Sequence, residues 1–171
     1  MDLVFDSSSI ILFHSITRLS FLNDIITALE AQFILLNTVE AEIITVPSSE
    51  IIETISNLKR IEINNPNRIN NLGIGESSVI EFIKESLSNS SSRVIAVLDD
   101  LRARKIAKEM NINVVGSLGL TTKGFQICLL ETKNDLNNLW EDWRSKGFYL
   151  PKKEDLNNYL STIEKINEQS K

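Results

Sequence analysis

Near its N-terminus the chain reads LVFDSSS over residues 3–9. The three apolar residues form a short run that is typical of a buried strand, and Asp6 ends it. The serines that follow suit a turn or the N-cap of a helix, because a serine hydroxyl can accept a hydrogen bond from a free backbone N–H there. The stretch therefore predicts a strand, an acidic tip and then a helix.

The same order recurs along the chain. Residues 33–36 and 94–98 are apolar runs that predict strands buried on both faces, and residues 112–115 predict another. Residues 60–71 are polar and predict either a short strand or a surface connection. Apolar residues at helical spacing predict helices over residues 10–19, 21–31, 39–46, 76–87, 101–110, 117–124 and 133–146, with a further one opening at residue 48 and a last one reaching about residue 168. This alternation predicts an α/β fold with a parallel sheet covered on both sides.

Length and composition set the broad class of the protein. The 171 residues have a formal net charge of −5 and include one cysteine, Cys128. This size predicts one domain over residues 1–171, with a C-terminal helical part from about residue 133. The apolar surroundings of Cys128 predict a buried, inert thiol, and no apolar stretch reaches the ~18 residues that a membrane span needs. We therefore expect a cytoplasmic protein with no membrane association.

Acidic residues follow two of the predicted strands directly. Asp6 ends the first apolar run, and Asp99 and Asp100 end the run at residues 94–98. Because the carboxyl ends of parallel strands meet at one edge of a sheet, where ligands bind, we expect these acids to lie close together. A single aspartate at such a position is most often only a helix cap. Two strands that end in this way favour a shared site.

Further carboxylates belong to the predicted helices. Glu76 lies in the first turn of its helix, and Glu42 follows Val39 by three residues, which turns it toward the apolar face of the helix. Glu40 is an alternative to Glu42. Several carboxylates in one small pocket would repel one another, and a hard divalent cation such as Mg²⁺ or Mn²⁺ would offset that repulsion.

Five stretches of the chain together resemble the successive motifs of PIN-domain proteins. In order they are VFDSSSI at residues 4–10, LGIGESSVI at 72–80, LDDLRARKIA at 98–107, VGSLGL at 115–120 and KGFY at 146–149. They are most similar to the VapC-like branch, which comprises prokaryotic predicted nucleic-acid-binding PIN proteins. The resemblance extends over nearly the whole chain, and it rests on the order and spacing of the motifs.

The resemblance implies a fold, a metal site and an activity. The fold is a PIN-like three-layer α/β arrangement, in which a small parallel sheet is flanked by helices. The catalytic and metal-binding acids fall on Asp6, Glu42, Glu76 and either Asp99 or Asp100, which together hold one or two Mg²⁺ or Mn²⁺ ions. The implied activity is that of a metal-dependent endoribonuclease, a hydrolase that cuts the phosphodiester bonds of single-stranded RNA. Many such proteins are toxins, so an antitoxin protein is the implied partner.

Two further interpretations concern binding rather than cleavage. The PIN scaffold can also serve as a catalytically silent RNA-binding or protein-interaction module, because a fold does not fix a chemistry. Arg102, Arg104 and Lys105 follow the acidic pair and suit either a phosphate contact or a solvated helix face. Residues 10–31 carry more apolar side chains than one helix face can bury, which predicts a homodimer, as does the resemblance.

Overall fold

The structure of the chain, a computed structural model, describes residues 1–89, 93–152, 156, 158 and 161. Within them, five strands form one all-parallel sheet in the order β3-β2-β1-β4-β5, which confirms the predicted α/β fold. The strands are β1 (Asp2–Phe5), β2 (Gln32–Leu36), β3 (Leu58–Ile61), β4 (Val94–Val97) and β5 (Val114–Val115).

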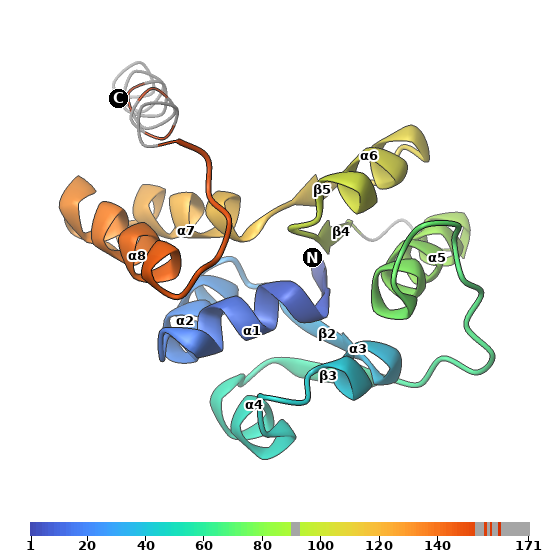
Figure 1. Cartoon of the computed structure of the whole chain (residues 1–171). Helices are drawn as coiled ribbons and strands as arrows, with labels where there is room; N and C mark the ends of the chain where they lie inside the picture. The colour runs from blue at the N-terminus through green and yellow to red at the C-terminus, as the bar shows by residue number, and fades with distance from the viewer. Residues whose placement is uncertain (90–92, 153–155, 157, 159–160, 162–171) are drawn as a thin grey trace.

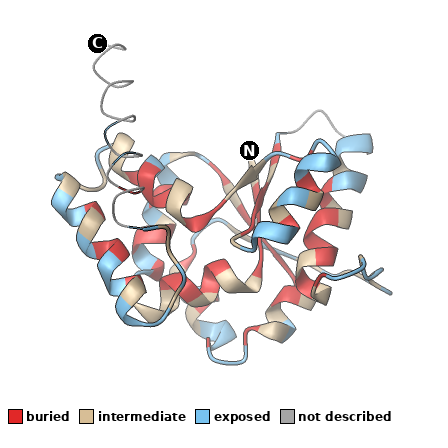
Figure 2. Cartoon of the chain, turned by 45° about the horizontal axis from the view of Figure 1, so that its top comes forward, coloured by how far each residue is buried: buried red, intermediate tan, exposed pale blue. Residues whose placement is uncertain are grey.

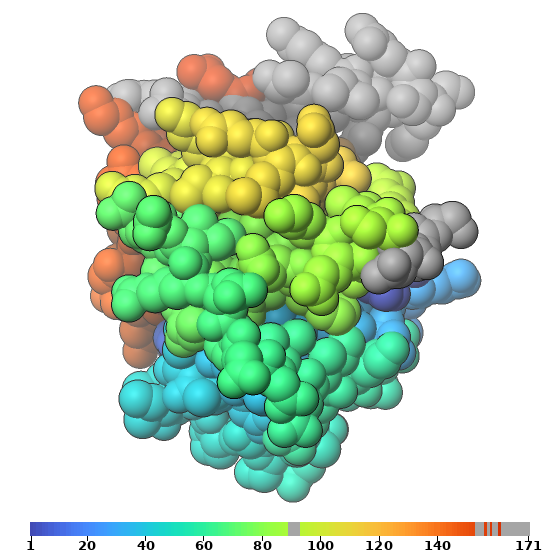
Figure 3. All heavy atoms as spheres, turned by 90° about the vertical axis from the view of Figure 1, so that its right-hand side faces the viewer, coloured from blue at the N-terminus to red at the C-terminus, as the bar shows by residue number. Residues whose placement is uncertain are grey.

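Helices cover both faces of the sheet (Figure 1). The described helices are α1 (Ser7–Ser15), α2 (Leu19–Ala28), α3 (Asn37–Glu42), α4 (Ser48–Thr54), α5 (Ile74–Asn89), α6 (Leu101–Glu109), α7 (Ser117–Gln126) and α8 (Lys133–Ser145). Helices α5 and α6 lie on one side of the strands, whereas α1, α2 and α7 lie on the other, with α8 packed outside α7. Figure 3 shows the outer face of the first side, where α6 lies above α5.

The core lies between these helix layers and the central strands (Figure 2). Strand β1 is flanked by β2 and β4, so its apolar residues are covered from all sides, and Val4 and Phe5 have no exposed surface. The rings of Phe5 and Phe33 stack with their centroids 4.0 Å apart. An apolar run without polar alternation therefore corresponds to a strand that is buried on both faces.

The register of the sheet brings the ends of the strands into line. Phe5 pairs with Val97, and the next residue, Asp6, donates its backbone N–H to the Val97 carbonyl at 3.1 Å. Leu98, which follows Val97, donates its backbone N–H to the Val115 carbonyl at 3.0 Å. The residues that follow β1, β4 and β5 therefore share one edge of the sheet.

Several boundaries differ from the predicted ones. Helix α1 begins at Ser7 rather than residue 10, because the serines after Asp6 form its first turn instead of a separate loop. Helix α3 ends at Glu42 and not near residue 46, because Ile43 leaves the helical conformation with a ψ of 64° and buries its side chain in the core. Residues 58–61 form a strand, and the polar segment after it is a connection. The predicted last helix, to about residue 168, falls mostly outside the described residues.

The apolar residues that suggested a dimer lie inside a single chain. All nine of those side chains on α1 and α2 and in the turns after them are buried or half-buried against the rest of the chain: Ile11, Leu12, Phe13, Ile16, Phe21, Leu22, Ile25, Ile26 and Leu29. The homodimer stays a prediction, but it would need another surface. Among the described helices none is by itself long and apolar enough to cross a membrane. Helices α1 and α2 reach that length and composition only together, and they meet at a bend of 119°.

The expectation of a buried thiol at Cys128 is wrong. Helix α7 ends at Gln126, and Cys128 follows in the turn with a φ of 61°, which exposes its side chain. Left-handed backbone just after a helix end closes the last turn and directs the chain away from the helix. Apolar neighbours along the sequence therefore did not place this residue in the core.

Helix α8 is joined to the core by two tryptophans. Trp143 is fully buried, donates its indole N–H to the Leu12 carbonyl at 3.1 Å and meets the Phe13 ring edge-on at 5.3 Å. Trp140 is also buried, and it donates to the Thr121 hydroxyl at 3.0 Å. Each indole thus combines a large apolar area with a satisfied polar group.

We predict that Trp143→Ala lowers the free energy of unfolding by about 3–5 kcal/mol, because it opens a cavity between α1 and α8. Trp143→Phe keeps most of the buried area and loses the hydrogen bond to Leu12, so its cost should be smaller, about 1–3 kcal/mol. Urea unfolding followed by circular dichroism measures both values. Equal, negligible losses would show that α8 is not part of the core.

Candidate functional site

The candidate site is built on Asp6, at the end of the central strand β1. Its side chain is only 2% exposed and caps α1, because it accepts hydrogen bonds from the Ser8 hydroxyl at 2.6 Å and the Ser8 N–H at 3.4 Å. Burial raises the pKa of the Asp6 carboxyl, and the nearby charge of Glu42 raises it further, against the lowering effect of the Ser7 and Ser8 hydrogen bonds. The site therefore contains an acid whose charged form is disfavoured.

Glu42 reaches the site from the last position of α3. Its Oε1 accepts a hydrogen bond from the Gly75 N–H at 2.8 Å, and its Oε2 accepts one from the Ser7 hydroxyl at 2.9 Å. The same Ser7 hydroxyl lies 3.5 Å from Asp6 Oδ1, so one serine joins the two carboxylates. A Cβ at position 75 would collide with the Glu42 carboxylate, so a larger residue there would require Glu42 to move.

Glu76 lies beside Glu42 in the first turn of α5. Its Oε2 accepts a hydrogen bond from the Gly73 N–H at 2.9 Å, and this N–H precedes the helix. Oxygens of Glu76 and Glu42 lie 3.6 Å and 3.8 Å from the position of a Cβ at Gly73, which places them in one neighbourhood. Burial raises the pKa of the Glu76 carboxyl most, and the charges of Asp6, Asp100 and Glu42 raise it further.

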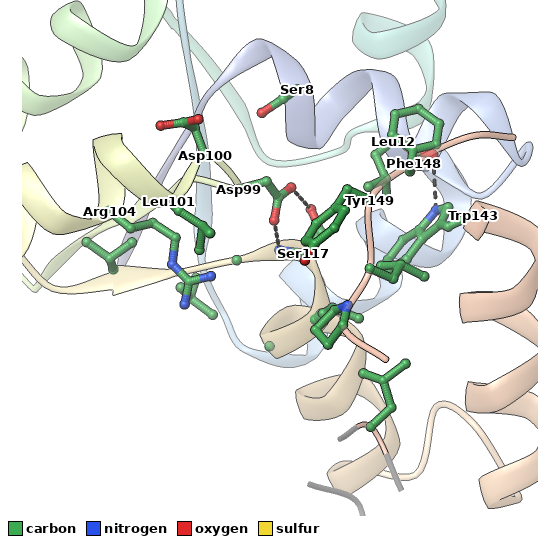
Figure 4. Close-up of a pocket in the computed structure, with 18 residues that line it drawn as sticks. Ser8, Leu12, Asp99, Asp100, Leu101, Arg104, Ser117, Trp143, Phe148 and Tyr149 are labelled. Atoms are coloured by element: carbon green, nitrogen blue, oxygen red, sulfur yellow. Dashed lines mark hydrogen bonds between the residues drawn. The ribbon is translucent and has the colours of Figure 1, made fainter. Parts of the chain in front are cut away.

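The two aspartates after β4 have different environments. Asp99 is half-buried and accepts hydrogen bonds from the Ser9 hydroxyl at 2.9 Å and from the Ser117 N–H at 2.8 Å, in addition to the Ser117 hydroxyl. Asp100 is exposed and caps α6, because its Oδ1 accepts from the N–H groups of Arg102 and Ala103, each at 2.8 Å. Figure 4 shows the Asp99 carboxylate directed at Ser117 and that of Asp100 pointing elsewhere.

Glu40 forms an ion pair with Arg60 and is thereby directed away from the other acids. Both of its oxygens bind the Arg60 guanidinium, with the closest contact at 2.6 Å. Its rival Glu42, two residues further along α3, contacts Ser7 and Gly75 instead. The structure thus brings Asp6, Glu42 and Glu76 together, with Asp100 near Glu76. Asp99 is instead hydrogen-bonded to Ser9 and Ser117, and Glu40 lies outside the group.

Neutral groups supply every hydrogen bond to the acids Asp6, Glu42, Glu76 and Asp99 in the described part of the chain. The donors are backbone N–H groups and the hydroxyls of Ser7, Ser8, Ser9 and Ser117. The sequence interpretation treated the serine run only as a turn or cap and missed that its hydroxyls contact three different carboxylates. The signal was available in the sequence, since three serines directly follow an acid at a strand end.

No three His, Cys, Asp or Glu side chains are arranged to hold a metal ion directly, as far as the described residues go. One oxygen each of Asp6, Glu76 and Asp100 has no short hydrogen bond: Asp6 Oδ1, Glu76 Oε1 and Asp100 Oδ2. A cation that keeps several waters could use such oxygens without three direct carboxylate ligands, as Mg²⁺ does. The donor set of oxygens alone fits a hard cation.

We predict that Asp6→Asn raises the melting temperature at about pH 7 in EDTA. A raised pKa means that the stability linked to this acid is fully present below the unfolded-state pKa and is lost as pH rises through the folded-state pKa. Asparagine has no charge to bury and can still cap α1. Each kcal/mol gained would raise the melting temperature by about 2–4 °C.

The difference between variant and wild type should shrink as pH falls toward about 4, near the pKa of an ordinary carboxyl. Differential scanning fluorimetry across that range measures it, with Asp100→Asn as the exposed control. A difference that grows toward acidic pH would contradict the buried-charge explanation.

Comparison with protein families places the chain among PIN domains. The family model described as DUF3368, a PIN domain, matches residues 2–165. Comparison with the curated proteins and with the solved structures gave no match. The matched stretch includes all five sheet strands and every acid of the candidate site. The chain therefore belongs to the DUF3368 family of PIN domains.

Proposed function

We propose that the chain is a metal-dependent endoribonuclease, which hydrolyses phosphodiester bonds of single-stranded RNA with Mg²⁺ or Mn²⁺. PIN domains are generally nucleases, and they usually use divalent metals. The observation that carries the proposal is the convergence of Asp6, Glu42 and Glu76 at one sheet edge with only neutral hydrogen-bond donors. Such a cluster lacks a positive charge.

The residues fit a divalent cation on three grounds. Their ligand atoms are carboxylate oxygens, which Mg²⁺ and Mn²⁺ prefer and which suit Zn²⁺ less well. The pKa values of Asp6 and Glu76 are raised by burial and by neighbouring negative charge, and a cation would oppose both effects. The described donors include no Lys or Arg that already offsets the charge of Asp6, Glu42 or Glu76.

Asp6, Glu42, Glu76 and one of Asp99 or Asp100 would hold the cation. When bound, it supplies a Lewis acid that stabilises negative charge on the reacting phosphate. The chain's own groups fix the acids in advance: Ser7 and the Gly75 N–H orient Glu42, and the Gly73 N–H orients Glu76. A site whose side chains are already oriented avoids reorganisation at the moment of reaction.

Asp99 and Asp100 differ in how each could serve as a ligand of the cation. Asp99 is held by three hydrogen bonds from Ser9 and Ser117, so its position is defined before substrate binds. Asp100 is exposed and keeps one oxygen without a donor, and its charge acts on Glu76. Comparing Asp99→Asn with Asp100→Asn in the assay below separates the two.

We predict that wild-type protein cleaves a mixed pool of single-stranded RNA with Mn²⁺ or Mg²⁺ and not with EDTA. Asp6→Asn and Glu42→Gln should each reduce the cleavage rate by about 100-fold or more, because even outer contacts of metal ligands are typically worth about 10- to 100-fold. Gel analysis of the end-labelled pool measures the rate. The loss of rate should exceed any loss of stability.

Glu40→Gln is the matched control for Glu42→Gln. It removes a carboxylate from the same helix, and it breaks an ion pair with Arg60 that is worth about 0–1 kcal/mol. It should cleave RNA as the wild type does. Cleavage that survives EDTA, or that is equal in wild type and Asp6→Asn, would refute the nuclease proposal. RNA binding without cleavage of any substrate would favour the silent module instead.

The resemblance to the VapC-like branch extends the proposal to the toxin of a toxin–antitoxin pair. A toxin of this kind should arrest bacterial growth when it is produced alone, and the arrest should depend on the same acids as cleavage. We predict growth arrest on induction of the wild type and normal growth on induction of Asp6→Asn at equal protein level. Unimpaired growth with an actively cleaving wild type would argue against the toxin role and leave the nuclease intact.

A further inference from the structure

A cavity of about 840 Å³ adjoins the acids of the candidate site. Its lining includes residues of α6 and of the segment 148–151, and it shares Ser8, Asp99 and Asp100 with the candidate site. Figure 4 shows the close approach of these elements around Asp99, with Arg104 on the α6 side and Tyr149 on the other. The cavity is therefore continuous with the candidate site, and its volume falls within the range of about 300–1,000 Å³ typical of small-ligand pockets.

The walls of the cavity combine apolar surface with one cation. Leu12, Leu118 and Phe148 contribute apolar side chains to it. The Arg104 guanidinium lies beside Gly116, with Nη1 3.4 Å from the position of a Cβ there, and makes no hydrogen bond or ion pair to any described residue. Asp99 Oδ1 lies 2.9 Å from the same Cβ position, so this cation lies near the Asp99 carboxylate but makes no hydrogen bond or ion pair to it. A cation that is not ion-paired, next to apolar side chains, is complementary to a nucleotide, which joins a negative phosphate to a flat base.

Tyr149 is presented at this cavity by a segment that is fixed on both sides. The Phe148 N–H donates to the Trp143 carbonyl at 3.2 Å, and the Arg144 guanidinium donates to the Pro151 carbonyl at 3.1 Å. Between these anchors the Tyr149 side chain is 90% exposed, although it lines the cavity. An uncovered aromatic ring on an anchored backbone segment is a surface on which a base can stack.

We infer that this cavity binds an unstacked base of the RNA, with the base on the Tyr149 ring and a neighbouring phosphate on Arg104. The inference rests on the proposed function, since it assigns the RNA subsite next to the acids that would cut it. A single-stranded segment suits this geometry because its bases can be splayed out of the stack, whereas paired bases are held in the duplex. Tyr149 and Arg104 thereby become residues that bind the RNA beside the acids.

The test combines removal of a side chain from the protein with removal of a base from the RNA. Protein is titrated into a fluorescent single-stranded oligoribonucleotide of about eight nucleotides, and binding is followed by fluorescence anisotropy. EDTA is present to remove the cation. The titration is repeated with oligoribonucleotides that each lack the base at one position. For the wild type, removal of the base that occupies the cavity should weaken binding about 5- to 100-fold, the range expected for one stacked base.

Tyr149→Ala should weaken binding of intact RNA by a similar factor and lose no further affinity when that base is removed, because the two deletions affect one contact. Tyr149→Phe keeps the ring and should bind within about threefold of wild type. Ile44→Ala changes a side chain that is 91% exposed and does not line the cavity, and it should have no effect. If the base-deletion penalty persists undiminished in Tyr149→Ala, the inference is wrong.

Arg104 is tested through the salt dependence of binding. Arg104→Ala should reduce the slope of log affinity against log salt concentration by about 0.7, the value for one phosphate contact on a single strand. Arg102→Ala is the matched control on the same helix, since the Arg102 guanidinium is exposed and donates to the Asn71 carbonyl. An equal change of slope in both variants would overturn the assignment of Arg104.

Cleavage kinetics show whether the cavity assignment or the nuclease proposal is wrong. With Mn²⁺, Tyr149→Ala should raise KM and leave kcat within about threefold of wild type, because it removes binding made equally before and during the reaction. If the wild type cleaves RNA and Tyr149→Ala has an unchanged KM, the cavity assignment alone is refuted. If no RNA is cleaved, the nuclease proposal fails, while the paired deletions in EDTA still decide whether the cavity binds a base.

Discussion

The rest of the structure depends on one constraint, the burial of the Asp6 carboxylate at the end of the central strand. An acid that is 2% exposed needs partners for its oxygens, because an uncompensated buried charge costs several kcal/mol. Asp6 obtains them locally, from Ser8 at the start of α1, and thereby fixes where that helix begins. Ser7 extends the same arrangement to Glu42, 35 residues away, and Ser9 extends it to Asp99. The end of β1, the start of α1 and the candidate site are thus formed by the same residues.

Parallel topology explains why these acids can be gathered although no described Lys or Arg side chain donates a hydrogen bond to them. In this sheet the helices that follow the strands begin at the same edge, so their free N–H groups and the positive ends of their dipoles point toward one region. Every acid of the cluster accepts such an N–H: Asp6 at the start of α1, Glu42 and Glu76 at α5, Asp100 at α6 and Asp99 at α7. Gly75 allows this because its missing Cβ leaves room for the Glu42 carboxylate.

These contacts hold the acids in place but leave their charge only partly offset. The pKa values of the Asp6 and Glu76 carboxyls are raised despite the hydrogen bonds they receive, because burial and mutual repulsion outweigh the donors. A natural protein keeps such a locally unfavourable arrangement where function needs it. The proposed metal-dependent nuclease activity would account for this cluster, and the adjoining cavity is where we propose that a base of the RNA binds.

The sequence by itself determined the α/β class, the three apolar strands β1, β2 and β4, and the acids that follow two of them, because apolar runs and the residues directly after them are local features. It also picked out Glu76 and Glu42, although Glu40 remained an alternative until the Arg60 ion pair set it apart. Only the tertiary structure decided which groups donate to each acid, that Cys128 is exposed, and that Tyr149 and Arg104 line one cavity with Asp99. Those relations join residues up to about a hundred positions apart, and they depend on crossover connections and strand register, which no local pattern encodes.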